Sequence, residues 1–230
     1  MKRFYKDVSV GQLEDGFSVL LDGRPVRTPG RNMLVLPTEK LAAAIAGEWQ
    51  AQDEEVIATS MPLLRLANTV VDGVAANRAE VIDAILRFGE NDLLCYRAHQ
   101  PPELANRQRE GWDPLLDWVR GRHGAEMRVA EGLTHVDQAP DALLALRQAL
   151  AAQSAFTIGA VHVIASITGS VVLALAVADG FISGRDAFAL SRIDETYQAE
   201  KWGEDAEAAR RAGNLALDLD KAVELMVAAR

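Results

Sequence analysis

The chain has 230 residues, of which 49% are hydrophobic and 25% charged, as in an ordinary globular protein with a sizeable core and one or two domains. Its net charge of −9 argues against a general nucleic-acid-binding protein, which needs a basic face. The single cysteine, Cys95, excludes an internal disulfide and any multi-cysteine zinc site. No apolar signal region follows Met1, so we expect a protein of the reducing cytoplasm.

Residues 3–36 have the pattern of β-strands. Asp22-Gly23 lies between the apolar run 17–21 and the segment 24–27, and this dipeptide is a strong hairpin signal because both central turn positions need positive φ. Pro25 lacks a backbone donor, which predicts that its strand lies at a sheet edge. Residues 33–36 predict a further short strand.

Helical patterns dominate from residue 38 onward. Starts are predicted at Thr38 (a helix to about Gln52), Leu63 (to about Val74), Asn77, Asp113-Pro114, Pro140-Asp141, Ser183 with Asp186 (one long helix to about Trp202), and Glu204. The expected fold class is α+β. A small β-rich N-terminal domain with one helix covers residues 1–72, and a larger all-helical orthogonal bundle covers residues 73–230.

Residues 155–178 contain no Lys, Arg, Asp or Glu and are long enough for a membrane span. However, the run holds several polar side chains and lacks flanking aromatic belts and basic anchors. Thr168-Gly169 interrupts it, and Ser170 is a suitable N-cap for a second helix. We therefore expect two buried helices wrapped by others, and no integral membrane segment.

Catalytic motifs are scarce. The four histidines are scattered without a His-x-x-x-His pair, and no Walker loop, Gly-x-Gly-x-x-Gly or Gly-x-Ser-x-Gly motif occurs. His162 is read as a core histidine with a satisfied hydrogen bond, the alternative being a general base. Cys95 is read as a small buried hydrophobe, the alternative being a nucleophile. No metal or other cofactor is expected.

Residues 194–205 form the least ordinary segment. On one continuous helix, Glu195 would point away from the stripe of Leu190, Ile193 and Tyr197 and share a face with Phe188, Arg192 and Trp202. One interpretation is a solvated face on which Glu195 pairs with Arg192, which contributes only a few tenths of a kcal/mol. The other is a recognition surface, since exposed aromatics beside charges are typical of protein-binding patches.

Nearly the whole chain resembles the family of ATP synthase assembly chaperones that bind the α subunit of the catalytic head. The stretches that carry the resemblance are Arg3-Phe4-Tyr5, Leu21-Asp22-Gly23-Arg24-Pro25-Val26-Arg27-Thr28-Pro29, Leu36-Pro37-Thr38, residues 46–52, Met61-Pro62-Leu63, Asn91-Asp92-Leu93-Leu94-Cys95-Tyr96-Arg97, Trp112-Asp113-Pro114, Glu195-Thr196-Tyr197-Gln198 and Trp202-Gly203. Two segments depart from the family pattern, Phe88-Gly89-Glu90 and the helix after Gly203.

The resemblance implies a chaperone rather than an enzyme. It is expected to hold the free α subunit until the β subunit arrives and to act as a monomer, with eukaryotic members in the mitochondrial matrix. It also implies a required carboxylate, with Glu195 the first choice and Glu200 the second. The expected partner-binding residues are Phe188, Arg192, Glu195, Tyr197, Gln198, Glu200 and Trp202. Two other functions stay open from the residues: a small-molecule enzyme that uses an interdomain pocket with His162 as base, and a structural subunit of a stable assembly.

Overall fold

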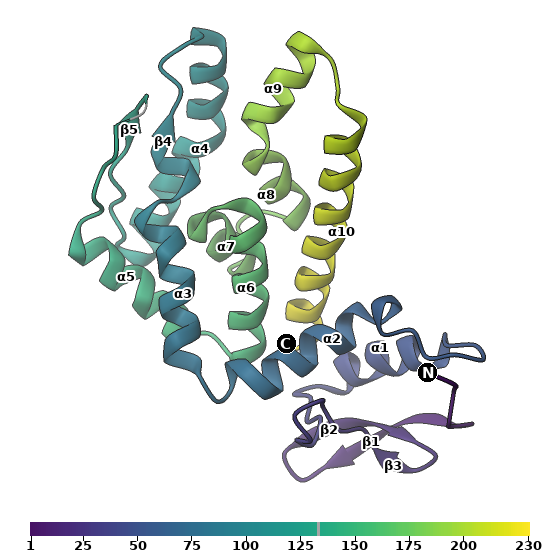
Figure 1. The fold of residues 1–230 in the computed structure, drawn as a ribbon. Helices are drawn as coiled ribbons and strands as arrows, with labels where there is room; N and C mark the ends of the chain where they lie inside the picture. The colour runs from purple at the N-terminus through teal and green to yellow at the C-terminus, as the bar shows by residue number, and fades with distance from the viewer. Residues whose placement is uncertain (133) are drawn as a thin grey trace. The chain divides into compact units, whose positions relative to one another are not determined.

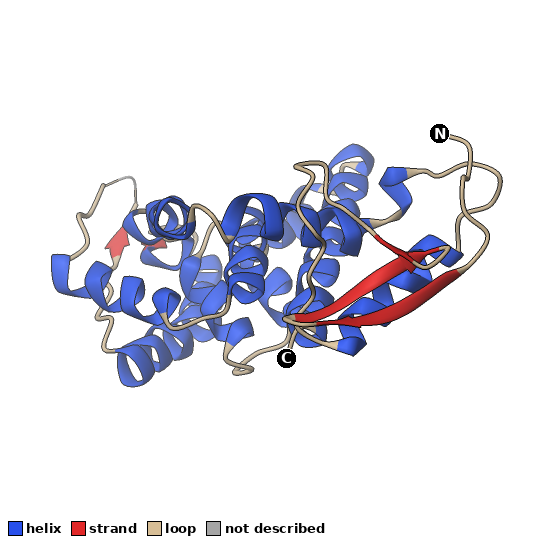
Figure 2. Cartoon of the chain, turned by 90° about the horizontal axis from the view of Figure 1, so that it is seen from below, coloured by secondary structure: helices blue, strands red, loops and turns tan. Residues whose placement is uncertain are grey.

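The computed structural model describes residues 1–132 and 134–230 and has the expected α+β architecture, with strands near the N-terminus followed by helices (Figures 1 and 2). Packing separates two units. The first comprises Met1–Arg78, Ser154–Ala160 and Lys221–Arg230, and the second comprises Ala79–Gln153 and Val161–Asp220. The segments Ser154–Ala160 and Lys221–Arg230 thus belong to the same unit as the N-terminal residues. A single domain boundary after residue 72 does not describe this division.

The first unit contains an antiparallel sheet in the order β1–β2–β3, built from β1 (Val8–Leu13), β2 (Gly16–Leu21) and β3 (Arg24–Pro25). Asp22 and Gly23 have φ angles of 48° and 77°, so the predicted Asp-Gly hairpin is confirmed. The predicted strand over Met33–Leu36 is wrong. Those residues make only isolated bridges to Arg27 and Phe17, because a bond from the Val35 amide to the Met33 carbonyl bends the segment.

Helix α1 (Glu39–Gln50) packs on β1 and β2 and begins where predicted, since the Thr38 hydroxyl accepts a hydrogen bond from the Leu41 amide. The next predicted helix is split into α2 (Pro62–Thr69) and a π-helical segment, η2 (Val70–Val74). The Glu48 carboxylate accepts hydrogen bonds of 2.8 Å from the Leu63 and Leu64 amides and so caps α2. A short 3₁₀ turn, η1 (Ala58–Ser60), precedes it.

The second unit includes most of α3 (Arg78–Glu90), α4 (Pro102–His123), α5 (Pro140–Ala151) and the 3₁₀ turn η3 (Leu93–Cys95). It is not purely helical, because β4 (Tyr96–Arg97) pairs in parallel with β5 (Ala130–Glu131).

A helix start at Asp113-Pro114 was predicted, and this is wrong because Pro114 lies inside α4. The helix continues through the proline because its buried face, which includes Leu104, Trp112 and Val119, runs along both halves. Packing of that face overrides the loss of one backbone donor.

The apolar run forms α6 (Ala155–Thr168) and α7 (Val171–Ala178), separated at Gly169, where φ is 70°. The predicted cap is confirmed, since the Ser170 hydroxyl accepts from the Leu173 amide at 3.0 Å. All eight residues of α7 are buried, and this helix packs against α4 and α8, whereas α6 leaves Ser166 exposed. Among the described residues, no helix is long and apolar enough to cross a membrane.

Candidate functional site

The segment singled out by sequence begins with a break that the pattern does not predict. Instead of one long helix, the chain forms α8 (Gly184–Ser191) and α9 (Ile193–Trp202), with non-helical φ and ψ of −115° and 17° at Arg192. Ser191 donates its hydroxyl to the Phe188 carbonyl at 2.8 Å, and such a side-chain bond competes with the helical backbone pattern. The start of α8 matches the prediction, because Ser183 and Asp186 form a capping box.

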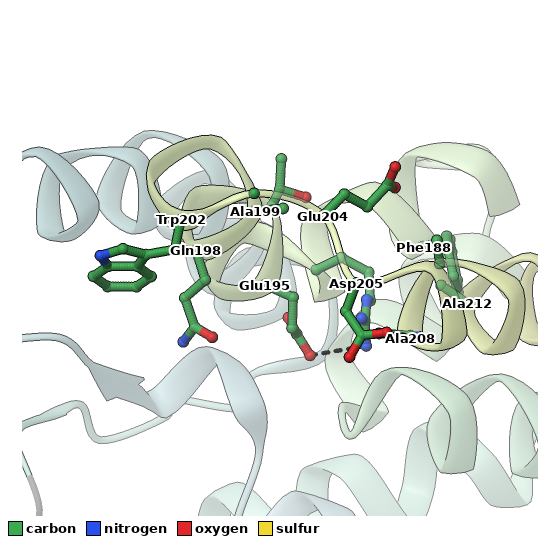
Figure 3. Close-up of a pocket in the computed structure, with 13 residues that line it drawn as sticks. Phe188, Glu195, Gln198, Ala199, Trp202, Glu204, Asp205, Ala208 and Ala212 are labelled. Atoms are coloured by element: carbon green, nitrogen blue, oxygen red, sulfur yellow. Dashed lines mark hydrogen bonds and ion pairs between the residues drawn. The ribbon is translucent and has the colours of Figure 1, made fainter.

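After a short connection the chain continues into α10 (Ala206–Ala228), and residues of α8, α9, this connection and the first turns of α10 line a groove of about 430 Å³ (Figure 3). All of its lining residues belong to the second unit. We call it the α9–α10 groove. Its apolar lining consists of Phe188, Ala199, Trp202, Ala208, Ala209 and Ala212. Four of these six are alanines, so the lining leaves room for side chains of another molecule.

The polar lining of the α9–α10 groove is mainly acidic. It consists of Glu195, Glu204 and Asp205, together with Arg192, Thr196 and Gln198. Among the described lining residues Arg192 is the one cation, and it is already paired, because its Nη1 lies 2.8 Å from Glu195 Oε1. Asp205 caps the start of α10, since its carboxylate accepts a hydrogen bond of 2.8 Å from the Glu207 amide. Glu204, by contrast, is exposed and makes no ion pair or hydrogen bond with the described residues.

Trp202 is the most exposed large apolar side chain of the described chain, at 78%. Figure 3 shows it projecting from the end of α9, with Gln198 and Glu195 on the preceding turns. An indole in water beside carboxylates offers apolar area, a hydrogen-bond donor and a face for a cation. This combination is typical of a protein-binding surface.

The two remaining predicted site residues lie on the other side of α9. Tyr197 is buried at 6% exposure, and its hydroxyl donates to Glu103 of α4 at 3.3 Å. Glu200 pairs with Arg107 at 2.8 Å, and Lys201 pairs with Glu103 at 2.9 Å. These contacts raise the pKa values of Arg107 and Lys201 and lower that of Glu103. The structure therefore uses Tyr197 and Glu200 to hold α9 on α4 and brings Phe188, Arg192, Glu195, Gln198 and Trp202 together in the groove.

The groove also contains residues that sequence reasoning did not select. Glu204, Asp205, Ala208, Ala209 and Ala212 reach it because α10 turns back beside α9. The signal available in the sequence was Gly203-Glu204-Asp205, a glycine followed by an acidic N-cap.

Cys95 and His162, the potential nucleophile and general base, do not lie in surroundings that would activate them for catalysis. Cys95 is fully buried, and desolvation, reinforced by the nearby Asp92 carboxylate, raises the pKa of its thiol to about 12. His162 is half-buried rather than a core residue, and burial lowers its pKa. No hydrogen bond joins its ring to the described residues, contrary to expectation. Within the described chain, no group of three or more His, Cys, Asp or Glu side chains is placed to hold a metal ion.

Comparison with known proteins identifies the family of this chain. The family model described as "ATP12 chaperone protein" matches residues 2–120. The crystal structure of Atp12 from Paracoccus denitrificans superposes with a TM-score of 0.96 at 42% identity, covering 100% of this chain and 98% of that one. A putative chaperone from Agrobacterium tumefaciens, Atu1473, superposes with a TM-score of 0.94 at 42% identity, covering 100% of this chain and 86% of that one.

A curated relative, the mitochondrial protein atp12 of Schizosaccharomyces pombe, is 24% identical over 220 residues, which is 89% of this chain and 75% of the relative. Together with the family match over more than half of the chain, these similarities decide between the classes of function that the residues left open. The chain belongs to the ATP12 chaperone family, the ATP synthase assembly chaperones that its sequence resembles, and is therefore a chaperone and not an enzyme.

Proposed function

We propose that the protein binds the free α subunit of the F-type ATP synthase catalytic head and keeps it from aggregating until the β subunit pairs with it. We propose the α9–α10 groove as the contact surface. The observation that carries this proposal is the exposed indole of Trp202 in one groove with the carboxylates of Glu195 and Glu204.

The physical reason for such a chaperone is the surface that an unassembled subunit exposes. An interface meant for a partner is apolar, and exposed apolar surface aggregates. The groove offers small apolar side chains for the apolar part of a binding segment and carboxylates for its cations. Since polar, partly hydrated contacts exchange more readily than a large apolar interface, this surface suits a partner that must later be displaced.

The geometry favours Glu195 over Glu200 as the required carboxylate. Glu195 lines the groove, and its side chain is 48% exposed, with only one oxygen paired to Arg192. Glu200 faces α4 and pairs with Arg107. Glu204 joins Glu195 as a second candidate because nothing in the described chain pairs with it.

A pull-down against separately purified α and β subunits tests the proposed partner. We expect the protein to retain α and not β, and to release α when β is added. Retention of β alone, or of neither subunit, contradicts the proposal. We further infer that the chaperone works as a monomer in the bacterial cytoplasm, where α and β would meet it.

A further inference from the structure

The first unit contains a second groove, of about 640 Å³, formed by the N-terminal segment, the Asp22-Gly23 hairpin and α1. Phe4, Tyr5 and Trp49 make an aromatic wall, with edge-to-face ring centroids 5.3 to 6.5 Å apart. Phe4 is 61% exposed, although its ring is entirely apolar. We call this site the aromatic–arginine groove. It includes the motif around Arg24-Pro25-Val26-Arg27, to which the chaperone function described above assigns no role.

The charge of this groove is opposite to that of the chain. Arg24 and Arg27 line it, and both are exposed. The side chain of Arg24 makes no ion pair or hydrogen bond with the described residues, and that of Arg27 donates to the Arg31 carbonyl at 2.9 Å. Residues 1–32 carry six basic and four acidic side chains, whereas the whole chain has a net charge of −9.

Asp22, the one carboxylate among the described lining residues, already has hydrogen-bond partners. Asp22 accepts from the Lys6 and Asp7 amides at 3.0 and 2.8 Å, and these bonds lower its pKa. It therefore ties the N-terminal segment to the hairpin. The nearby charge of Arg24 also lowers the pKa of Asp22, but no hydrogen bond joins the Arg24 guanidinium to this carboxylate.

Trp49 supplies an independent observation. Its side chain lines the groove and is 7% exposed, yet its indole N–H is buried and donates to no acceptor in the described chain. A buried donor without an acceptor is rare in folded proteins and needs an explanation. A bound molecule that displaces part of the groove lining around this N–H would supply the missing acceptor.

We propose that the aromatic–arginine groove binds an acidic, apolar peptide segment of a protein partner. A large apolar side chain of that segment lies on Phe4 and Pro25, and neighbouring carboxylates pair with Arg24 and Arg27, whose planar guanidinium groups match carboxylates in two-bond geometry. This proposal does not depend on the α9–α10 groove, whose acidic lining selects segments of the opposite charge.

Fluorescence anisotropy with the full chain tests the proposal. The probe is a labelled synthetic peptide that alternates glutamate and leucine around one phenylalanine, and the control peptide carries lysine in place of glutamate. We expect the parent protein to bind the acidic peptide, less tightly as salt is added, and not the basic one. The double variant Arg24→Glu/Arg27→Glu should bind it at least tenfold more weakly and melt at the same temperature, because both side chains are exposed.

The matched control is Lys40→Glu/Arg65→Glu, which makes the same charge change at exposed positions of the first unit outside this groove. Its affinity should stay within about twofold of the parent. Trp49→Phe keeps an aromatic ring and removes the donor, and it should bind severalfold more weakly. Equal binding by the groove variant and the parent would overturn the proposal. So would binding of phosphatidylserine vesicles through the two arginines without binding of the acidic peptide, which would indicate a membrane surface instead.

Discussion

Replacing Glu195 with lysine should abolish chaperone function with little effect on the fold. The side chain is 48% exposed, and its only ion pair within the described chain is with Arg192, which is itself 28% exposed. Such a pair contributes less than about 1 kcal/mol, and a like-charged Lys–Arg pair three residues apart costs a few tenths more. For a chain of this size, about 1 kcal/mol lowers the melting temperature by about 2–4 °C.

The effect on binding should be larger. A carboxylate that pairs with a basic group of the α subunit in a desolvated contact contributes roughly 2 kcal/mol or more, which corresponds to about a thirtyfold weaker complex when the pair is lost. Light scattering of free α subunit, with thermal melts of the same variants, measures both effects. We expect Glu195→Lys to melt within a few degrees of the parent and to leave the α subunit aggregating.

The controls follow from the contacts. Glu200→Lys is a poor control for charge alone, because it breaks the pair with Arg107 that holds α9 on α4. Asp218→Lys is better matched, since Asp218 is exposed on α10 and lies outside the α9–α10 groove. It should protect the α subunit as the parent does. If Glu195→Lys melts at a much lower temperature than the parent, Glu195 has a structural role. If the variant protects the α subunit normally, the binding surface lies elsewhere.

Three further outcomes are expected. Ile164→Asp should cost several kcal/mol in a urea titration, because a charge would enter a site with 0% exposure; equal stability would contradict burial of α6. Asp92 is buried, and desolvation is the main reason why its pKa is raised to about 6. The folded state therefore binds the proton of this carboxyl group more tightly than the unfolded state does. Stability should therefore fall by at most about 3 kcal/mol as the pH rises from about 4 to about 6, and Asp92→Asn should lack this dependence. Folded Cys95→Ala and His162→Gln should still protect the α subunit, and loss of protection would restore a catalytic role.

Local rules predicted the parts of the fold that local chemistry controls. Thr38, Ser170 and Ser183 are caps that act within three residues, and the sequence places all of them correctly. Asp22-Gly23 likewise specifies its turn through the φ angles that those two residues tolerate.

Features that depend on tertiary contacts were not predictable in this way. Pro114 reads as a helix start, but a buried face that spans both halves of α4 keeps the helix continuous. The break at Arg192 has no glycine or proline to mark it.

The part of the candidate site that lies on α9 was predictable, whereas the part that depends on contacts with other helices was not. The helical period places Glu195 opposite Tyr197, and this holds within α9. It cannot tell that Glu200 finds Arg107 on α4, or that Glu204 and the alanines of α10 complete the groove. Both relations join residues of different helices or of a connection between helices, so the periodicity of a single helix does not contain them.

The most direct test asks whether the α subunit occupies the α9–α10 groove. A photo-crosslinking amino acid at position 198 reports contact there, because Gln198 lines the groove and its side chain makes no hydrogen bond to the described residues. The same amino acid at the exposed position of Asp218 is the control. We predict a crosslink to the α subunit from position 198 and not from position 218, and its disappearance when the β subunit is added. Equal crosslinking from both positions, or none from position 198 while the α subunit stays protected, would contradict the account.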